Sequence, residues 1–365
     1  RRHADEAVRG AMPLSWFRAE QFRCLESVEL ELDPATNIFV GPNASGKTSL
    51  LEAAFFLGRG RSFRSRRRDS LIRHGQTAFL LAGRSSGGVA PVMLGVRARR
   101  NGTEWQAGGA PASGVATLAE QFPAQVIDPE IHKLLEEGPG RRRRFLDWGV
   151  FHVEPAFLTT WRRYHLALRQ RNAALKQGRA DSDLAAWEQE LASSGEELVR
   201  QREAYLARLR DPLRTIGEAL LGSPIALVHS RGGDEKLPLL EALGADRGRD
   251  RRYRATQSGP HRGDAVVEVG GRAAKDHVSR GQQKLVAAGL MLAQLQIQEE
   301  ERPGRSALLL DDPAAELDSE NLTLLMAAVR MVPTQLWVTS LRENIPGLPE
   351  RGRMFHVEQG AIRPA

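Results

Sequence analysis

The stretch Gly41-Pro42-Asn43-Ala44-Ser45-Gly46-Lys47-Thr48-Ser49 fits the pattern G-x-x-x-x-G-K-[S/T] of a phosphate-binding loop. An apolar segment typical of a strand, 36–40, precedes it, and an apolar segment typical of a helix, 50–57, follows. Strand, glycine-rich loop and helix in this order are the context that the motif requires. We therefore predict that these nine residues bind a nucleoside triphosphate, in the first place ATP with Mg²⁺.

Each part of the loop has an expected task. The backbone amides of Ala44 to Lys47 and the N-terminus of the following helix offer positive partial charge to phosphate oxygens. Lys47 is expected to reach the β- and γ-phosphates, and Thr48 is expected to ligate Mg²⁺.

Composition limits the class of protein. A chain of 365 residues exceeds one ordinary core, so two domains or a large insertion are expected. Its net charge of +7 is carried mostly by arginine, which favours a polyanionic partner, first of all DNA. A genome-wide preference for arginine is the alternative explanation. The single cysteine, Cys24, excludes an intrachain disulfide and fits a cytoplasmic location. With no apolar run of about 18 residues, no membrane partner is expected.

The pattern of the chain changes twice. After a polar extension at 1–11, which we expect to be disordered, strand patterns dominate 12–125 and include an antiparallel sheet from strands near 78–84 and 91–100. Residues 126–254 are arginine-rich and helical, and strand–helix alternation returns at 255–365. The sequence therefore predicts an α/β ATPase head in two halves, 12–125 and 255–365, with an inserted helical lobe at 126–254.

The inserted lobe carries two amphipathic helices. Apolar residues recur at steps of three and four from Leu158 to Leu175 and again from Leu184 to Tyr205, with a polar loop at 177–182 between them. An antiparallel helical hairpin follows, and its few interrupted heptads exclude a long coiled-coil arm. The segment 247–252 is interpreted as an exposed turn that closes the lobe.

An apolar strand at 306–310 ends in two acids and predicts the second half of the nucleotide site. Asp311 is expected to hold Mg²⁺, directly or through water. Asp312 is expected to activate the attacking water, and because aspartate is one methylene shorter than glutamate, we expect slow hydrolysis. Thr339 or Ser340, at the end of the next strand, is expected to take the switch position.

The segment Ser279-Arg280-Gly281-Gln282 opens an apolar helix and resembles the signature motif of the ATP-binding cassette superfamily. The resemblance implies that the Ser279 hydroxyl and the helix N-terminus contact the γ-phosphate bound to a second subunit. The alternative is an ordinary capping box, Ser-x-x-Gln. Asp318 matches the loop that crosses the dimer interface in the same superfamily.

Seven motifs occur in an order that resembles the RecF family of bacterial recombination mediators, part of the structural-maintenance-of-chromosomes (SMC) group of ATPases. They lie at 41–49, 58–64, 143–152, 170–175, 257–262, 279–284 and 311–318. Two positions depart from the family pattern: Gly263 stands where an acid is expected, and Pro313 where an aromatic residue is usual. Gln125 is placed like the lid glutamine that senses Mg²⁺ and the γ-phosphate, and a polar residue at a strand edge is the alternative.

The resemblance implies an ABC/SMC-like head with a short arm, and an ATP-dependent homodimer that holds duplex and single-stranded DNA at gaps. It also implies a weak, DNA-stimulated ATPase in DNA repair, recombination, replication restart and the SOS response. RecR and RecO are the implied partners in loading RecA.

Two arginine groups are candidate contacts for DNA phosphates. They comprise Arg61, Arg64, Arg66, Arg67 and Arg68 after the phosphate-loop helix, and Arg141 and Arg142 in the lobe. Aromatic residues are sparse there, so backbone recognition of duplex is expected rather than base stacking. Solvated faces or internal ion pairs are the alternative for each arginine. A transporter cassette or other generic ABC ATPase subunit, and a structural chromosome protein, are the competing functions.

Overall fold

Strand β3 (Thr36–Val40), which leads into the phosphate loop, lies inside a six-stranded sheet with the order β15-β14-β3-β13-β12-β8. β14, β3, β13, β12 and β8 are parallel, and only the edge strand β15 is antiparallel. All five residues of β3 are buried, as expected for a strand covered on both faces. The other strands are β8 (Ala124–Ile127), β12 (Ala307–Leu310), β13 (Gln335–Ser340), β14 (Arg353–Glu358) and β15 (Ala361–Pro364).

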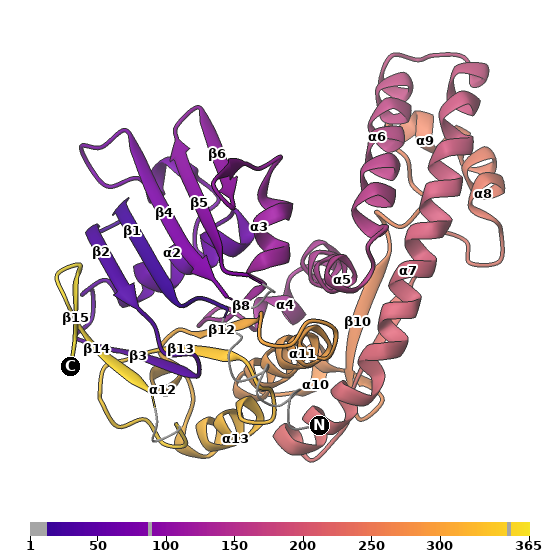
Figure 1. The fold of residues 1–365 in the computed structure, drawn as a ribbon. Coiled ribbons are helices and arrows are strands. Elements are labelled where there is room, and N and C mark those ends of the chain that lie inside the picture. Colours follow the sequence, from indigo (N-terminus) through magenta and orange to yellow (C-terminus); the bar gives the residue numbers. More distant parts are fainter. Residues whose placement is uncertain (1–12, 87–89, 349–351) are drawn as a thin grey trace. The chain divides into compact units, whose positions relative to one another are not determined.

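The structure is a computed structural model that describes residues 13–86, 90–348 and 352–365 (Figure 1). The predicted disordered extension at 1–11 lies outside these residues. Contacts divide the chain into unit 1, which comprises the residues up to 131 and from 288 onward, and unit 2, which comprises 132–287. Among the described residues, no helix is both long and apolar enough to cross a membrane.

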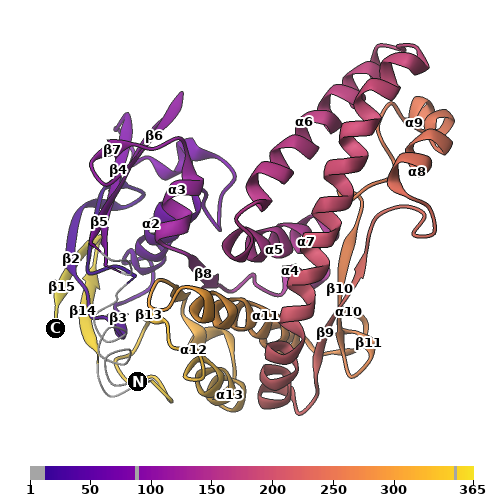
Figure 2. The same cartoon turned by 45° about the vertical axis from the view of Figure 1, so that its right-hand side comes forward.

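Unit 1 contains a second six-stranded sheet, which is antiparallel with the order β2-β1-β4-β5-β6-β7. Its strands are β1 (Trp16–Phe22), β2 (Leu25–Glu31), β4 (Ala78–Ser85), β5 (Val92–Arg99), β6 (Gly102–Ala107) and β7 (Ala110–Pro111). β4 and β5 pair along their whole length, which confirms the antiparallel strands predicted there. This sheet and the parallel sheet form the two β-layers of unit 1 (Figure 2).

Helix α2 (Lys47–Arg59) packs between the two sheets and builds the core of unit 1. Its residues from Leu50 to Leu57 are almost completely buried. Phe39 stacks on Phe355 at 5.1 Å between ring centroids, and Phe17 meets Trp337 edge-on at 5.6 Å. Aromatic side chains from both sheets thus hold the phosphate-loop strand and helix in place. The remaining elements of unit 1 are η1 (Arg68–Leu71), α3 (Val115–Gln121), α12 (Pro313–Glu316) and α13 (Ser319–Val329).

Unit 2 is built on the hairpin of α6 (Phe157–Lys176) and α7 (Asp181–Leu221), which confirms the predicted antiparallel pair. α7 is 41 residues long and continues through Pro212, well beyond the predicted repeat. A three-stranded antiparallel sheet, β11-β10-β9, completes the unit together with shorter helices. These elements are α4 (Lys133–Glu136), α5 (Pro139–Val153), β9 (Ile225–Ser230), α8 (Leu239–Ala245), α9 (Arg247–Tyr253), β10 (Asp264–Val269), β11 (Arg272–Ala273) and α10 (Ala274–His277).

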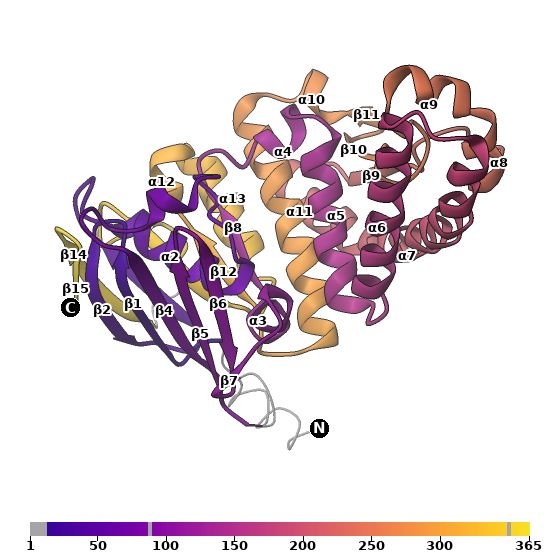
Figure 3. The ribbon, with the colours of Figure 1, turned by 90° about the horizontal axis from the view of Figure 1, so that it is seen from above.

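Two features of unit 2 differ from the sequence interpretation. The turn expected at 247–252 is wrong, because this segment forms helix α9. The units also divide elsewhere than at 254/255: β10 pairs with β9 over six residues, so the segment 255–287 packs with the helical lobe. The signature motif is therefore carried by unit 2, and α11 (Arg280–Glu301), which it opens, continues into the sequence of unit 1 (Figure 3).

Candidate nucleotide site

The phosphate loop is held by close backbone contacts that admit only glycine. A Cβ on Gly41 would lie 2.1 Å from the carbonyl oxygen of Val357 on β14. Gly46, which precedes α2, has φ +115°, and a Cβ there would meet Cys24 Sγ at 3.2 Å. The amide of Gly360 donates to Ser45 O at 2.7 Å, so the β14–β15 turn braces the loop. The two motif glycines thus fit a fixed, close-packed loop.

Lys47 turns its ammonium group back onto the loop. Its Nζ donates to the carbonyl oxygens of Gly41 at 2.6 Å and Pro42 at 2.8 Å. Burial lowers the pKa of Lys47, while the nearby carboxylates of Asp312 and Asp311 act in the opposite direction. Phosphate oxygens are acceptors as well, so they can replace the two carbonyls as partners of this ammonium.

Asp311 is the meeting point of two hydroxyl groups. Thr48 Oγ1 and Thr339 Oγ1 each donate to Asp311 Oδ1 at 2.9 Å. Burial raises the pKa of Asp311, and these two hydrogen bonds oppose the rise. The sequence thus placed Thr48 and Asp311 in one site although they are 263 residues apart.

The donor set around Thr48 fits Mg²⁺ held together with phosphates. Among the described residues, no group of three His, Cys, Asp or Glu side chains is placed to hold a metal by itself. Mg²⁺ characteristically takes one or two protein oxygens, with phosphates and water completing its octahedron. Thr48 and Asp311 would supply those protein oxygens, and bound Mg²⁺ would neutralise charge on the phosphates.

Asp312 lies in a strained backbone conformation beside this pair. Its φ of 46° is left-handed, which costs a non-glycine residue roughly 1 kcal/mol or more. Its amide donates to Thr339 Oγ1 at 2.9 Å, and this bond helps to hold the conformation. Burial raises the pKa of Asp312, which makes its carboxylate a better proton acceptor. The half-buried side chain suits the predicted role in activating water.

Thr339 therefore fixes both acids, and its replacement tests that role. Thr339→Val keeps the shape but removes the hydroxyl, so Asp311 loses a donor and the Asp312 amide loses its acceptor. We expect ATP turnover to fall about tenfold or more, since each lost contact to a charged or buried group is worth about 1.5–3 kcal/mol. Thr339→Ser keeps the hydroxyl and should retain most activity. Phosphate release assays check this, and equal activity of the two variants would contradict the role.

Glu52 is a functional candidate that the sequence reasoning missed. It is completely buried on α2, and Arg23 binds it with two hydrogen bonds of 2.9 and 2.7 Å. Ser62 Oγ also donates to Glu52, and Arg64 Nη1 lies 3.7 Å from it. Arg23 itself has a φ of +54° in the β1–β2 turn. The only sequence signal is an acid inside an otherwise apolar helix stretch, 50–57.

The predicted DNA-contact arginines fall into three classes. Arg66, Arg67 and Arg68 are exposed on the segment that leads into η1, and Arg61 is exposed just before it. Arg64 is exposed but lies 3.7 Å from Glu52, and Arg141 forms an ion pair with Glu137, four residues earlier. Arg142 binds both oxygens of Asp264 at 2.8 and 2.9 Å and also donates to backbone carbonyls. The prediction of a DNA contact for Arg142 is therefore corrected, because its guanidinium group binds Asp264 and backbone carbonyls inside unit 2.

The start of α11 is both a capping box and an exposed surface. Ser279 Oγ accepts from the Gln282 amide at 3.3 Å, and Gln282 Oε1 accepts from the Ser279 amide at 3.0 Å. Ser279, Arg280 and Gln282 are exposed, and Gly281 is half-buried. The two interpretations of this motif are thus compatible, because the cap leaves the serine hydroxyl and the helix N-terminus facing solvent.

Two further predicted residues lie in unit 1. Asp318 is exposed and caps α13, with Oδ1 accepting from the Asn321 amide at 2.8 Å. Gln125 is buried on the edge strand β8, and its Nε2 donates to Gln294 Oε1 at 2.8 Å. This bond gives the Gln125 amide a structural contact, and its role as a lid stays a prediction.

Comparison with known proteins shows the family of this chain. The family model described as "RecF/RecN/SMC N terminal domain" matches residues 13–361. The "DNA replication and repair protein RecF" of Erwinia tasmaniensis is 38% identical, over 96% of this chain and 98% of its own length. The protein of the same name from Chromohalobacter salexigens is 40% identical, over 96% and 99%. The chain belongs to the RecF family.

Solved structures agree with the fold. A structure titled "Structure of the recombination mediator protein RecF-ATP in RecFOR pathway" matches with a TM-score of 0.86 at 24% identity, over 97% of this chain and 98% of that one. A Smc head bound to the C-terminal winged-helix domain of ScpA matches with a TM-score of 0.59 at 15% identity, over 96% of each chain. The ABC/SMC-like α/β head predicted for this RecF-family chain is thereby confirmed.

The RecF-family motifs of the helical lobe form a buried polar network. Arg171 is fully buried, and it donates to Glu188 at 2.9 Å, to Asp250 at 2.6 Å and to Thr256 Oγ1 at 2.9 Å. Asn172 Oδ1 accepts from the Thr256 amide at 2.8 Å. The motif at 170–175 thus holds the segment that leads into the motif at 257–262. Asp264, the residue after Gly263, is an acid and is the partner of Arg142.

His261 is held neutral inside this network. Its Nε2 contacts the carbonyl oxygen of Thr256 at 3.0 Å, and since a carbonyl only accepts, Nε2 carries the proton. Tyr164 Oη therefore donates to Nδ1 at 2.6 Å. Burial, aided by Arg262, His165 and Arg143, lowers the pKa of His261 to about 4.

This pKa predicts a loss of stability in acid. The folded-state pKa of His261 lies below the ordinary value of about 6.5. The stability that neutral His261 contributes is therefore complete above pH 6.5 and is lost as pH falls towards 4. At 1.36 kcal/mol per unit, the free energy of unfolding should decrease by about 3 kcal/mol over that window. Urea titrations of the wild type and His261→Gln at pH 7.5 and 4.5 check this. A variant as acid-sensitive as the wild type would contradict it.

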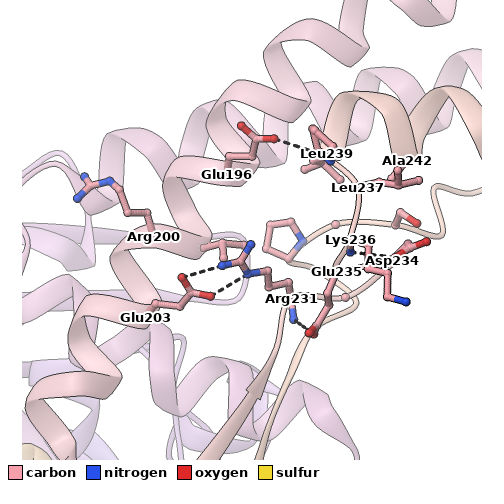
Figure 4. Close-up of a pocket in the computed structure, with 17 residues that line it drawn as sticks. Glu196, Arg200, Glu203, Arg231, Asp234, Glu235, Lys236, Leu237, Leu239 and Ala242 are labelled. Carbon is pink, nitrogen blue, oxygen red and sulfur yellow. Dashed lines mark hydrogen bonds and ion pairs between the residues drawn. The ribbon is translucent and has the colours of Figure 1, made fainter.

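Cavities lie in both units of the described part of the chain. In unit 1, a cavity of about 750 Å³ lies beside the phosphate loop, between residues 42–45 and the β14–β15 hairpin. In unit 2, a cavity of about 610 Å³ lies between α7 and the segment 231–239 (Figure 4). Arg231 binds Glu203 at 2.8 Å across it, and Glu196 accepts from the Leu239 amide at 3.0 Å. These charged groups are thus already engaged with one another and with the backbone.

Proposed function

We propose that this RecF-family chain is an ATP-gated DNA-binding protein of recombinational repair and replication restart. Binding of ATP with Mg²⁺ closes a homodimer that holds duplex DNA near gaps, and slow, DNA-stimulated hydrolysis releases it. With RecR and RecO, the dimer helps to load RecA on single-stranded DNA in the cytoplasm. The names of the curated relatives, DNA replication and repair proteins, support this pathway.

The hydrogen bond between Thr48 and Asp311 carries the proposal. It joins the phosphate loop to the acid at the end of β12, and this is the arrangement in which Mg²⁺ bridges a phosphate-loop hydroxyl and an acidic strand. Lys47 and the α2 N-terminus supply positive charge to the same place. A pocket of this chemistry positions and neutralises phosphates, which is what catalysis of phosphoryl transfer requires.

The exposed start of α11 supports a dimeric site. A helix of 22 residues that begins directly after an exposed serine is suited to bind an anion at its N-terminus. On an isolated subunit this end faces solvent, so a γ-phosphate on a second subunit is the natural ligand. Exposed Asp318, matched to the interface loop, supports the same arrangement.

Two observations count against the competing functions. In a transporter cassette the phosphate loop and the signature lie close together in the sequence. Here most of unit 2 (132–287) lies between the phosphate loop and the signature. A structural chromosome protein needs a long arm, whereas the hairpin partner α6 has 20 residues, or about 30 Å.

Sedimentation of the protein with and without ATP tests the dimer. We expect ATP and Mg²⁺ to shift the wild type from monomer to dimer and to leave Ser279→Arg monomeric, because the new side chain occupies the phosphate position. Ser193→Arg, on an exposed face of α7, adds the same charge elsewhere and should dimerise normally. ATP-dependent dimers of Ser279→Arg at wild-type strength would rule out the trans role of the signature.

A further inference from the structure

Helix α9 has two faces of different character. Its segment Arg247-Gly248-Arg249-Asp250-Arg251-Arg252-Tyr253-Arg254 holds five arginines within eight residues. It lies beside α8 in unit 2 (Figure 2). Residues three and four apart share a helix face, so Arg247, Asp250 and Arg251 form one face and Arg249, Arg252 and Tyr253 form another.

The first face is fixed inside unit 2. Asp250 is fully buried and accepts from Arg171 at 2.6 Å and from the Gln257 amide at 2.8 Å. Arg247 binds Glu188 at 2.5 Å, and Arg251 pairs with Asp181. The charged side chains on this side therefore form internal ion pairs, and these pairs anchor α9 to both helices of the hairpin.

The second face is cationic, aromatic and open to solvent. Arg249, Arg252 and Arg254 are exposed. Tyr253 is 59% exposed, the largest fraction among the exposed large hydrophobic side chains of the described residues. The Arg252 guanidinium lies 5.9 Å from the centroid of the Tyr253 ring. A single exposed ring is common on protein surfaces, but this ring lies among three exposed arginines, so the surface combines a π-face with positive charge and suits a partner with both π-faces and negative charge.

We propose that this α9 surface, formed by Arg249, Arg252, Tyr253 and Arg254, binds single-stranded nucleic acid. Tyr253 stacks on an unpaired base while the arginines contact the flanking phosphates. Base–aromatic stacking and a basic track are the two elements by which proteins bind single strands without sequence preference. Bases in a duplex are already stacked on each other and do not offer a face to Tyr253. An acidic peptide would satisfy the arginines but leaves no specific role for the ring.

The α9 surface belongs to unit 2, whereas the predicted duplex contacts on 61–68 belong to unit 1. It gives the protein a way to recognise the single-stranded part of a gap. The inference rests on the proposed DNA binding for its biological meaning, yet it can be tested without ATP or a dimer, because all four residues lie on one helix and its C-terminal flank.

Fluorescence anisotropy without nucleotide tests it on three labelled ligands of 20 units: oligo-dT, an abasic strand with the same phosphates, and a blunt duplex. Tyr253→Ala is expected to weaken oligo-dT binding about 30-fold, the mid-range effect of losing one stacked base, and to leave the other two ligands unchanged. Tyr253→Phe keeps the ring and should bind like the wild type. Because Tyr253 is exposed, neither variant should disturb folding.

The arginines have a matched control. Replacing both Arg249 and Arg252 by Gln should reduce the dependence of log K on log salt for oligo-dT by about 0.7 per arginine. Arg162→Gln with Arg169→Gln removes two exposed charges from α6 and should change that dependence less. Equal binding of oligo-dT by Tyr253→Ala and the wild type would overturn the proposal. A loss of equal size on the abasic strand would do so too, since the surface would then sense phosphates only. Neither result would bear on ATP gating, which the sedimentation experiment tests.

Discussion

Lys47→Met is expected to reduce ATP turnover by about 10²–10³-fold, the loss that follows removal of one preorganised charge-stabilising donor in an active site. The Lys47 ammonium is the side-chain cation already seated inside the loop, 2.6 Å from Gly41 O and 2.8 Å from Pro42 O. Methionine fills the same space without donating a hydrogen bond, so the phosphates lose their charged partner. Phosphate release with saturating DNA measures the effect.

Lys47→Arg is the informative companion of this variant. It keeps the positive charge, but the planar fork of arginine does not fit the place of a compact ammonium, so turnover should still fall clearly. Binding of a fluorescent ATP analogue separates loss of affinity from loss of the chemical step. Wild-type turnover in Lys47→Met would contradict a role of the phosphate loop in hydrolysis.

Arg171→Met is expected to destabilise unit 2 by about 3–5 kcal/mol. Arg171 is fully buried and is the common partner of Glu188 and Asp250, so its loss leaves buried Asp250 without a cation and Glu188 with Arg247 alone. The desolvation cost of the buried carboxylate is then no longer offset, because methionine fills the volume of arginine but carries no charge. Hydrogen exchange of the α6 and α9 peptides should rise strongly, and exchange in the β3 and α2 peptides of unit 1 should change little.

Arg163→Met provides the matched control. Arg163 also lies on α6 and binds a carboxylate, Glu190, but at the surface, where such a pair is worth about 1 kcal/mol or less. Its unfolding free energy should therefore stay close to that of the wild type. Similar exchange in Arg163→Met and Arg171→Met would show that the buried network is not a main source of stability.

The nucleotide half of the site could be predicted because its chemistry is written in local patterns. The loop at 41–49 has fixed spacing, and an apolar strand that ends in Asp311 and Asp312 has few other uses once that loop is present. The helical hairpin could be predicted as well, because its apolar positions recur with the helical period. The phosphate loop and the two acids meet in space because β3, β13 and β12 pair in parallel.

Long-range polar contacts could not be predicted in the same way. Nothing in the sequence near Glu52 shows that Arg23, Ser62 and Arg64 converge on it, because Arg23 lies in the β1–β2 turn while Ser62 and Arg64 lie in the segment after α2. The segment 247–252 has the composition of an exposed turn, and it forms a helix because buried Arg171 binds Asp250. For the same reason the boundary at 254/255 missed the pairing of β10 with β9. Tertiary contacts override local composition at these places.

In the proposed function, ATP bound across a dimer controls the binding of DNA. Anisotropy of a labelled gapped duplex, measured with and without ATP for the wild type and Ser279→Arg, tests it most directly. We expect tight binding only for the wild type with ATP, and weak, salt-sensitive binding in the other three conditions. Equal binding in all four would mean that the arginines merely attract phosphates, and the ATP-gated clamp would have to be abandoned.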